Sequence, residues 1–402
     1  MSLRRALDRL QPLFREGGRL ARLEAVYEMV DQMLYTPAMT ARDAPHIRDA
    51  LDLKRVMWCV MLALLPCLLI GLYNTGYQAN SALELLGREA PAGWAAGLLG
   101  SIGYDPDSVL ACVAHGLVCF LPIYLVVLVV TAFWSILFAA VRKHDIDEAA
   151  AVTAMLFTMV LPPQIPLWQA ALGISFGIVI GKELFGGVGK NFINPALAGW
   201  AFLYFAYPEG MSGDTVWVAV DEFSRATPLM VAKTGGVASM IAEGFTWGES
   251  FLGIVPGTLG AESAMGSLLG AVFFIYVGVA SWRIMGSVLI GAVATALLFN
   301  LAGSAELPLS TVPWHWHLVL GNLAFCAVFM ATDPVSAAQT RRGRWVYGLL
   351  IGFLAVLIRV LNPTLPEGAM LAILFGNLAA PILDYADMRL NVRRRAMRDA
   401  GA

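Results

Sequence analysis

Long apolar segments, separated by short polar ones, make up most of the hydrophobic pattern of this chain. A helix rises about 1.5 Å per residue and a hydrocarbon core is roughly 30 Å thick, so segments of this length are typical of transmembrane helices. The pattern predicts an all-α polytopic membrane protein with about ten spans. They lie at approximately 56–73, 110–140, 149–163, 165–181, 192–207, 265–282, 284–301, 315–331, 345–361 and 368–385.

The third and fourth predicted spans are separated by a proline-rich stretch, Leu161-Pro162-Pro163-Gln164-Ile165-Pro166. Proline removes a backbone donor and blocks helix continuation. We therefore expect two short helices that meet in a tight turn. The stretch 74–109 is expected to connect two spans on the outer side, either as a hairpin or as a docking surface.

Polar segments divide the chain into five predicted regions. These are a cytoplasmic N-terminal arm, a first five-helix half, an outer loop, a second five-helix half and a basic cytoplasmic tail. They occupy residues 1–55, 56–207, 208–264, 265–386 and 387–402. An odd number of helices per half gives the halves opposite orientations, so we predict an inverted repeat, an arrangement that often places a binding site near the midplane.

The N-terminal arm has its own periodicity within 18–35. Apolar residues recur there at helical spacing, at Leu20, Leu23, Tyr27, Val30 and Leu34. This spacing predicts an amphipathic helix. Such a helix lies on the membrane, docks on a partner or packs as an ordinary cytoplasmic helix, and the pattern leaves these alternatives open.

Composition supports the membrane assignment. The chain is 58% hydrophobic and 14% charged, whereas soluble domains carry about 25% charged residues. The charged start is followed by no apolar core, so we expect no secretory signal and a first apolar run that stays as a span. The net charge of -2 gives no reason to expect a nucleic-acid partner.

Basic residues are distributed unequally between alternate connections. One set holds Arg142, Lys143, Lys182, Lys190, Arg283, Arg341, Arg342 and Arg344, and the C-terminal tail adds Arg389, Arg393, Arg394, Arg395 and Arg398. The opposite set holds Arg88, Arg225, Lys233 and Arg359. By the positive-inside rule, both termini are cytoplasmic and the loop 208–264 is outside. We expect a multi-pass membrane protein.

The five cysteines all fall in apolar runs and form no Cys-x-x-Cys pair; they are Cys59, Cys67, Cys112, Cys119 and Cys326. They are expected as small buried residues rather than cluster ligands. No metal site is predicted. Any redox carrier of this chain should therefore be organic.

One polar string in the outer loop is a candidate modification site. Ser224-Arg225-Ala226-Thr227-Pro228-Leu229 places a threonine hydroxyl at a membrane edge, on the predicted outer side. Taken alone, the string is a polar turn ended by proline. It resembles the Ser-Gly-Ala-Thr flavinylation motif of the sodium-translocating NADH:quinone reductases and their Rnf-type relatives, with Arg225 in place of the glycine. Arg225 either hinders a modifying enzyme or pairs with a phosphodiester, since arginine suits phosphate geometry.

The resemblance to this family extends along the chain. It covers Leu161-Pro162-Pro163, the glycine-rich run Gly181 to Gly199, Ala331-Thr332-Asp333-Pro334-Val335-Ser336 and Arg359-Val360-Leu361-Asn362-Pro363. These motifs occur in the same order in the B-type subunit of the sodium pump. The Rnf D-type subunit typically lacks a long polar arm, so the 55-residue arm favours the B-type subunit.

The resemblance implies two flavins and a quinone. FMN would be esterified to Thr227 by a separate flavin transferase, and a noncovalent riboflavin would lie in the helical bundle. Within the glycine-rich run, Gly187 permits an irregular backbone and Asn191 and Asn194 offer amide groups, so these residues are candidates for the riboflavin site. A structural re-entrant loop is the alternative.

The same resemblance places a ubiquinone site near the cytoplasmic end of the second span. The candidates are Trp134, Ser135 and the titratable His144. The family usually has glutamate where Ser135 stands, which puts an acid role there in doubt. A solvated positive-inside loop is the alternative for the stretch around His144.

Acidic residues at helix ends are candidates for guiding sodium, because charged groups in a membrane are costly. They are Glu183, Asp333 and Asp384, with pairing or capping as the alternative. His315 and His317, beside Trp314 and Trp316, are expected as an aromatic belt.

The resemblance thus implies a membrane subunit of a sodium-exporting NADH:ubiquinone reductase, with no catalytic residue of its own for NADH oxidation. Its partners would be the other subunits of a six-subunit complex, especially the second covalent-FMN subunit and the NADH-oxidising subunit. The alternatives are an Rnf D-type subunit of a ferredoxin:NAD oxidoreductase and a flavin-free channel or secondary transporter.

Overall fold

The computed structural model describes residues 53–88, 94–100, 102–142, 149–303, 307–362 and 367–399. Their regular structure is helical, and no strand occurs in these ranges. Six helices are long and apolar enough to cross a membrane, and four shorter ones are also apolar. The all-α polytopic prediction is confirmed. The N-terminal arm with its predicted amphipathic helix lies outside the described residues.

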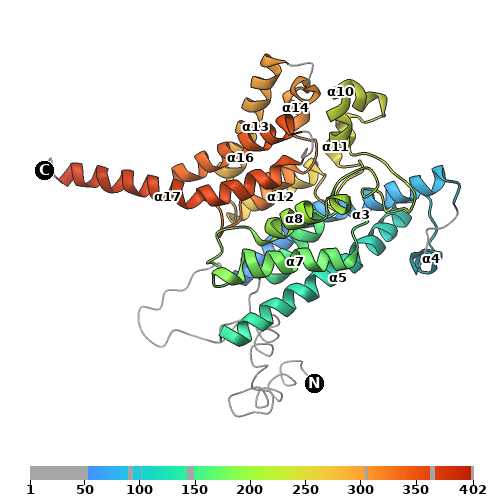
Figure 1. The fold of residues 1–402 in the computed structure, drawn as a ribbon, viewed down its shortest axis with the longest axis horizontal. Helices are drawn as coiled ribbons and strands as arrows, with labels where there is room; N and C mark the ends of the chain where they lie inside the picture. Colours follow the sequence, from blue (N-terminus) through green and yellow to red (C-terminus); the bar gives the residue numbers. More distant parts are fainter. Residues whose placement is uncertain are drawn as a thin grey trace, which may run out of the picture.

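The first half of the chain supplies five main helices. They are α3 (Leu53–Leu85), α5 (Val109–Arg142), α6 (Ala150–Met159), α7 (Leu167–Gly181) and α8 (Pro195–Ala206), with the short α4 (Trp94–Leu99), η2 (Glu183–Phe185) and α9 (Pro208–Met211) between or after them. Helices α3 and α5, α5 and α7, and α7 and α8 pack side by side (Figure 1). The predicted pair of short helices that meet at the proline-rich turn is present as α6 and α7.

The first span is longer than the sequence predicts. Helix α3 continues to Leu85, so the expectation of a connecting stretch from residue 74 is wrong for its first part. Polar residues end the apolar run there, but Asn74, Gln78 and Asn80 are buried against protein rather than lipid. Asn74 donates to the Val255 carbonyl at 2.8 Å, which satisfies its amide within the fold.

Helices α3 and α5 approach closely through two glycines. A β-carbon at Gly76 would lie 1.8 Å from the Cys112 carbonyl oxygen, and one at Gly116 would lie 1.9 Å from that of Leu72. No side chain larger than hydrogen fits at either position. Small residues are the usual means by which helices pack in lipid.

The second half supplies α12 (Ala264–Val277), α13 (Trp282–Ala302), α16 (Arg341–Leu361) and α17 (Gly368–Asp399). Helix α16 packs against both α13 and α17, and α17 extends beyond the bundle toward the C-terminus (Figure 1). The order of the helices is compatible with an inverted repeat, which stays a prediction.

The predicted span 315–331 is not one helix. It consists of α14 (Trp314–His317), α15 (Leu323–Phe325) and the π-helix η4 (Cys326–Met330), preceded by η3 (Pro308–Thr311). Gly321 adopts a φ of 62°, a left-handed conformation that favours glycine and ends regular helix. His317 is fully buried, so its assignment to an aromatic belt is also wrong.

The region 208–264 is more ordered than a simple loop. It contains α10 (Pro228–Ala242) and α11 (Trp247–Leu252), and its last part returns to the core. Leu259 and Gly260 donate backbone hydrogen bonds, both of 3.0 Å, to the carbonyls of Leu161 and Met159 at the end of α6. We call this side of the bundle the Thr227 end, and the opposite side, with residues 182–194 and 331–340, the Asn194 end.

Candidate functional site

Thr227 occupies the N-cap of helix α10. Its Oγ1 accepts a hydrogen bond from the Met230 amide at 3.3 Å, and Pro228 occupies the first helical position. Threonine at the N-cap and proline just after it are preferred helix-start residues. Because the first amides of a helix and its dipole attract anions, the oxygen of Thr227 lies where a phosphate would be stabilised.

The residues before Thr227 are held from two directions. The backbone amide of Arg225 donates to the Asp214 carbonyl at 2.8 Å. The side chain of Arg225 donates from Nη1 to Gln78 Oε1 at 3.2 Å. The guanidinium also lies over the Phe245 ring, 5.4 Å from its centroid. The Arg225 side chain is therefore engaged with α3 and with a residue that follows α10, while Ser224 is exposed.

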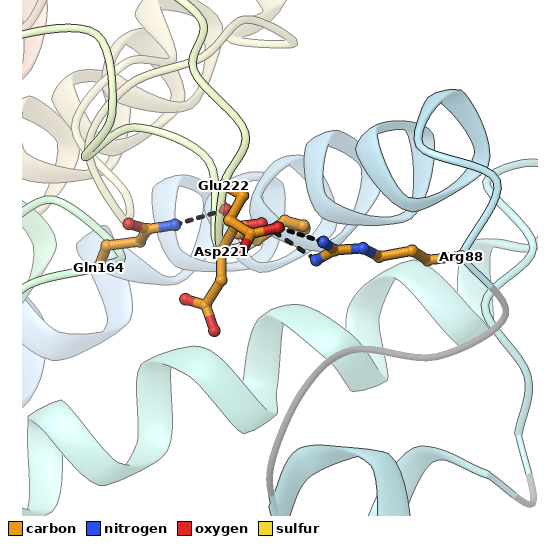
Figure 2. Close-up of polar contacts among 5 residues, drawn as sticks. Arg88, Gln164, Asp221 and Glu222 are labelled. Carbon is orange, nitrogen blue, oxygen red and sulfur yellow. Dashed lines mark hydrogen bonds and ion pairs between the residues drawn. The ribbon is translucent and has the colours of Figure 1, made fainter.

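The part of the same segment that precedes Ser224 is clamped by two further side chains. Gln164, from the proline-rich turn, donates from Nε2 to the Val218 and Val220 carbonyls at 2.6 and 2.8 Å. Arg88 pairs with the Glu222 carboxylate and donates to the Asp221 carbonyl (Figure 2). Glu222 is the one described non-glycine residue with positive φ, 67°, a conformation that strains its backbone.

A cavity of about 350 Å³ lies at the Asn194 end. Its walls come from α3, α6, α8, α12, η4 and the loops at that end. They are mostly apolar, and the polar groups among them are Thr153, Lys182, Asn191, Asn194, Thr332 and Asp333. This combination of apolar walls and a few polar groups is typical of a small-molecule site. Two of the three riboflavin candidates line it; Gly187 does not, and Gly189 of the same run does.

Asn191 and Asn194 also shape the loop that bounds this cavity. Asn194 is the N-cap of α8, and its Oδ1 accepts from the Ala196 and Leu197 amides at 3.0 and 3.3 Å. Asn191 donates to the Ile193 carbonyl at 3.1 Å. Asn194 Nδ2 also contacts the Met330 sulfur at 3.9 Å. Both side chains line the cavity and keep part of their hydrogen-bonding capacity, since an amide group can make up to four hydrogen bonds.

The three sodium candidates have different surroundings. Glu183 is buried, with Lys182 Nζ 3.5 Å and Arg142 Nη1 4.0 Å from its carboxylate. Asp333 lines the cavity; burial raises its pKa, an effect that its hydrogen bond from the Ser336 hydroxyl partly offsets. Asp384 accepts three hydrogen bonds of 2.7–2.9 Å from Gln339 and Thr340, so its carboxylate holds the loop that leads into α16.

The quinone candidates are described in part. Trp134 donates to the Ser175 hydroxyl at 2.9 Å, which joins α5 to α7. Ser135 is buried, and its hydroxyl has no hydrogen-bond partner among the described residues. His144 lies outside the described residues. Trp134 and Ser135 both lie on α5, and neither lines the cavity at the Asn194 end.

A second group of buried polar residues was not predicted from the sequence. Arg359 is 1% exposed and donates to the backbone carbonyls of His317 and Leu320, both at 3.0 Å. Burial, and to a smaller extent the neighbouring Glu367 carboxylate, raises the pKa of Glu262 to about 8. The only signal in the sequence was the charge itself, within or beside apolar runs.

Together, fold and sites define a multi-pass, all-α membrane protein with a mostly apolar cavity, which carries a few polar groups, between its helices and a threonine hydroxyl at a helix start. The profile of the NQR2, RnfD, RnfE family matches residues 40–392. A protein of Azotobacter vinelandii described as the B-type subunit of a Na(+)-translocating NADH-quinone reductase is 50% identical over 404 residues, which cover 99% of this chain and 100% of the relative.

Proteins with the same description from Pseudomonas aeruginosa (strain LESB58) and Chromohalobacter salexigens are each 48% identical. The first similarity covers 99% of this chain and 100% of the relative, and the second covers 100% and 97%. The chain therefore belongs to the NQR2, RnfD, RnfE family. The resemblance to the B-type subunit of the sodium-translocating NADH:quinone reductases is confirmed.

Proposed function

We propose that this subunit carries covalent FMN on Thr227 and a noncovalent riboflavin, and passes electrons to ubiquinone while the complex exports sodium. The observation that carries the proposal is the position of Thr227 Oγ1 at the N-cap of α10, hydrogen-bonded to the Met230 amide. The phosphate of an ester on this oxygen would accept hydrogen bonds from the first backbone amides of the helix. The group, when attached, supplies reversible electron-transfer chemistry at the Thr227 end.

The position of Thr227 also constrains its modification. The residue is 4% exposed and lines a narrow cavity. A flavin transferase can reach its oxygen only while the segment around it is displaced. After modification, the contacts of Gln164 and Arg88 with this segment would form again. Arg225 would return to its contacts with Gln78 and Phe245.

The cavity at the Asn194 end fits an isoalloxazine ring system. Its volume of about 350 Å³ lies within the usual range for small-molecule sites, and its apolar walls suit a flat aromatic ring. Asn191 and Asn194 would hydrogen-bond the polar edge of the ring, and the Lys182 ammonium would lie near its carbonyl oxygens. Each such hydrogen bond contributes about 1 kcal/mol net.

Ubiquinone would approach α5 from the lipid, near Trp134 and Ser135. Phe133 is exposed, so one side of this part of α5 faces outward from the subunit, while Ser135 is buried on another side. Protons for the reduced quinone would come from the adjacent connection that contains His144. Sodium is the cargo of the complex, and Glu183 and Asp333 remain candidates for receiving it at the Asn194 end.

The proposed setting follows from the family. The partners are the other subunits of the complex, among them the second covalent-FMN subunit and the NADH-oxidising subunit, together with the flavin transferase during assembly. The membrane would be the bacterial inner membrane, with both termini cytoplasmic. The Thr227 end is then the outer one.

The decisive experiment is to measure covalent flavin on the chain produced together with the transferase. Intact mass should show one added FMN, and the denatured band should fluoresce under ultraviolet light. Thr227→Val should abolish both signals, whereas Thr227→Ser, which keeps a hydroxyl at the N-cap, should retain them. An unmodified wild-type mass would contradict the proposal.

A further inference from the structure

A second, smaller cavity lies beside Thr227. Its volume is about 20 Å³, and its polar lining includes Thr227, Thr258, Asn322 and Glu367. About 10–15 Å³ is enough for one water molecule, so this space holds one small occupant, a water molecule or a single unhydrated monovalent ion. We call it the Glu367 cavity.

Two polar atoms of the Glu367 cavity lack partners among the described residues. They are Glu367 Oε2 and Asn322 Nδ2, and Asn322 is fully buried. A buried polar group without a partner costs about 1–3 kcal/mol, and more when it is charged. Two such groups on one cavity indicate that an occupant completes their coordination.

The turn that follows α14 leaves room for the Glu367 carboxylate beside the cavity. Gly321 has a φ of 62°, and a β-carbon there would lie 2.9 Å from Glu367 Oε1. Glycine thus allows the carboxylate to approach the backbone of the broken helix. The backbone N–H of Asn322 donates to the Glu367 carboxylate, which fixes the carboxyl group beside the cavity.

Two carboxyl groups share one guanidinium around the Glu367 cavity, and the raised pKa of Glu262 means that a proton balances the group when no cation is bound. Two buried carboxylates, Glu262 and Glu367, lie in the electrostatic range of one buried guanidinium, that of Arg359. The Arg359 hydrogen bonds go to the His317 and Leu320 carbonyls. With both carboxylates ionised, the group carries one excess negative charge, which either a proton or one monovalent cation neutralises.

The neutral ligands of such a cation are also present. Thr258 Oγ1 donates to Glu262 at 3.3 Å and accepts from the Ala261 amide at 3.2 Å, so one lone pair of its oxygen is left. Within the part of the chain that the structure describes, Asn322 Oδ1 is engaged only by the Cys326 thiol, at 3.8 Å. Rotating the amide by half a turn exchanges that weak contact for an oxygen ligand in the cavity.

We propose that the Glu367 cavity binds one sodium ion, with Glu367 as its anionic ligand and Thr258 and Asn322 as neutral oxygen ligands. A divalent ion is disfavoured because Ca²⁺ takes six to eight oxygen ligands and Mg²⁺ usually retains several waters, which this volume cannot hold. The proposal rests on sodium export as the proposed function. The proposed ion site lies at the Thr227 end, and none of the sodium candidates predicted from the sequence, Glu183, Asp333 and Asp384, belongs to it.

The test is equilibrium binding of ²²Na⁺ to the purified complex, with Glu367→Gln as the main variant. This change keeps the size of the side chain and removes its charge. We expect the variant to lose one bound ion per complex at subsaturating sodium, and the half-saturating sodium concentration for quinone reduction to rise at least 10-fold. The matched control is Glu243→Gln, an exposed glutamate that follows α10 at the same end.

Thr258→Val provides a second variant in case Glu367→Gln fails to assemble. It removes a neutral ligand only, so a rise of about 3- to 10-fold in the half-saturating concentration is expected. A cavity that holds water alone, with a proton neutralising the carboxylates, would leave sodium binding unchanged in both variants, which would overturn the proposal. Covalent FMN is scored in the same preparations, so a dark wild-type band would count against the Thr227 assignment and not against the ion site.

Discussion

Arg225 donates a hydrogen bond to Gln78 across 147 residues of sequence. The contact joins the segment before Thr227 to the buried end of α3. Gln78 in turn donates to Asn74 at 3.3 Å, and Asn74 donates to Val255. One chain of hydrogen bonds therefore links the candidate attachment segment, the first span and the return segment before α12.

Replacing Gln78 by leucine should loosen the attachment segment. The substitution keeps the bulk of the side chain and removes the acceptor for Arg225. Hydrogen bonds to charged groups contribute about 1.5–3 kcal/mol, and about 1.4 kcal/mol is a factor of 10 in an equilibrium. We expect amide exchange of residues 214–227 to accelerate about 10-fold or more, measured by hydrogen–deuterium exchange. Equal exchange in Gln78→Leu and in the exposed control Glu243→Gln would show that the contact does not hold the segment.

Arg225→Gly restores the residue of the flavinylation motif and tests the departure from it. In the structure the guanidinium lies on Gln78 and Phe245. We therefore expect the final extent of Thr227 esterification to stay within about twofold of wild type, because the side chain is not needed at the hydroxyl. Its initial rate should rise, because the contact with Gln78 that holds the segment closed is lost. The measurement is the fluorescence of the denatured band per mole of chain. A strong gain would mean that arginine hinders the transferase, and a loss would mean that it assists.

Gly76→Ala should disrupt the contact between α3 and α5. The added β-carbon would meet the Cys112 carbonyl oxygen at 1.8 Å, so the two helices must separate. Overpacking of this kind typically costs about 1–3 kcal/mol, and backbone contact leaves little room to relax. The yield of monodisperse, detergent-solubilised protein should fall. Gly286→Ala on α13 is the control, since no atom lies within 4 Å of its β-carbon position and its yield should be unchanged.

The helices were the most predictable part of this protein. Apolar runs and the proline-rich turn gave α6 and α7 with small errors at their ends, because span length and proline chemistry are local properties. The same reasoning ended the first span too early. Asn74 and Gln78 are polar, and only tertiary contacts with Val255 and Arg225 show why a helix continues through them.

The sites were less predictable for the same physical reason. Asn191 and Asn194 stood out because a glycine-rich run surrounds them, and both line the larger cavity. Glu262 and Glu367 did not, and Arg359 was noted only as a basic residue and as part of a family motif, because the significance of all three depends on separate segments meeting in space. The break after α14 was also hidden, since the run 315–331 is mostly apolar and a single positive φ at Gly321 interrupts it.

Glu183→Gln should destabilise the Asn194 end. Lys182 and Glu183 are both buried, with Nζ and Oε1 3.5 Å apart. Removing one partner of a buried pair typically costs about 3–5 kcal/mol, whereas replacing both by apolar residues is often neutral. We expect a lower melting temperature for Glu183→Gln and recovery in the double variant Lys182→Met/Glu183→Leu. A single variant as stable as wild type would show that the pair contributes little.

Asn191→Ala should weaken retention of a noncovalent flavin without affecting the covalent one. Asn191 lines the larger cavity and caps no helix, since the N-cap of α8 is Asn194. Loss of one hydrogen bond of about 0.5–1.5 kcal/mol predicts roughly 3- to 10-fold faster loss of flavin. The measurement is acid-extractable flavin per complex during dialysis, with the Thr227 band as the internal reference. Lys190→Ala, an exposed change in the same loop, is the control and should retain flavin as wild type does. Identical retention in the two variants would remove Asn191 from the site.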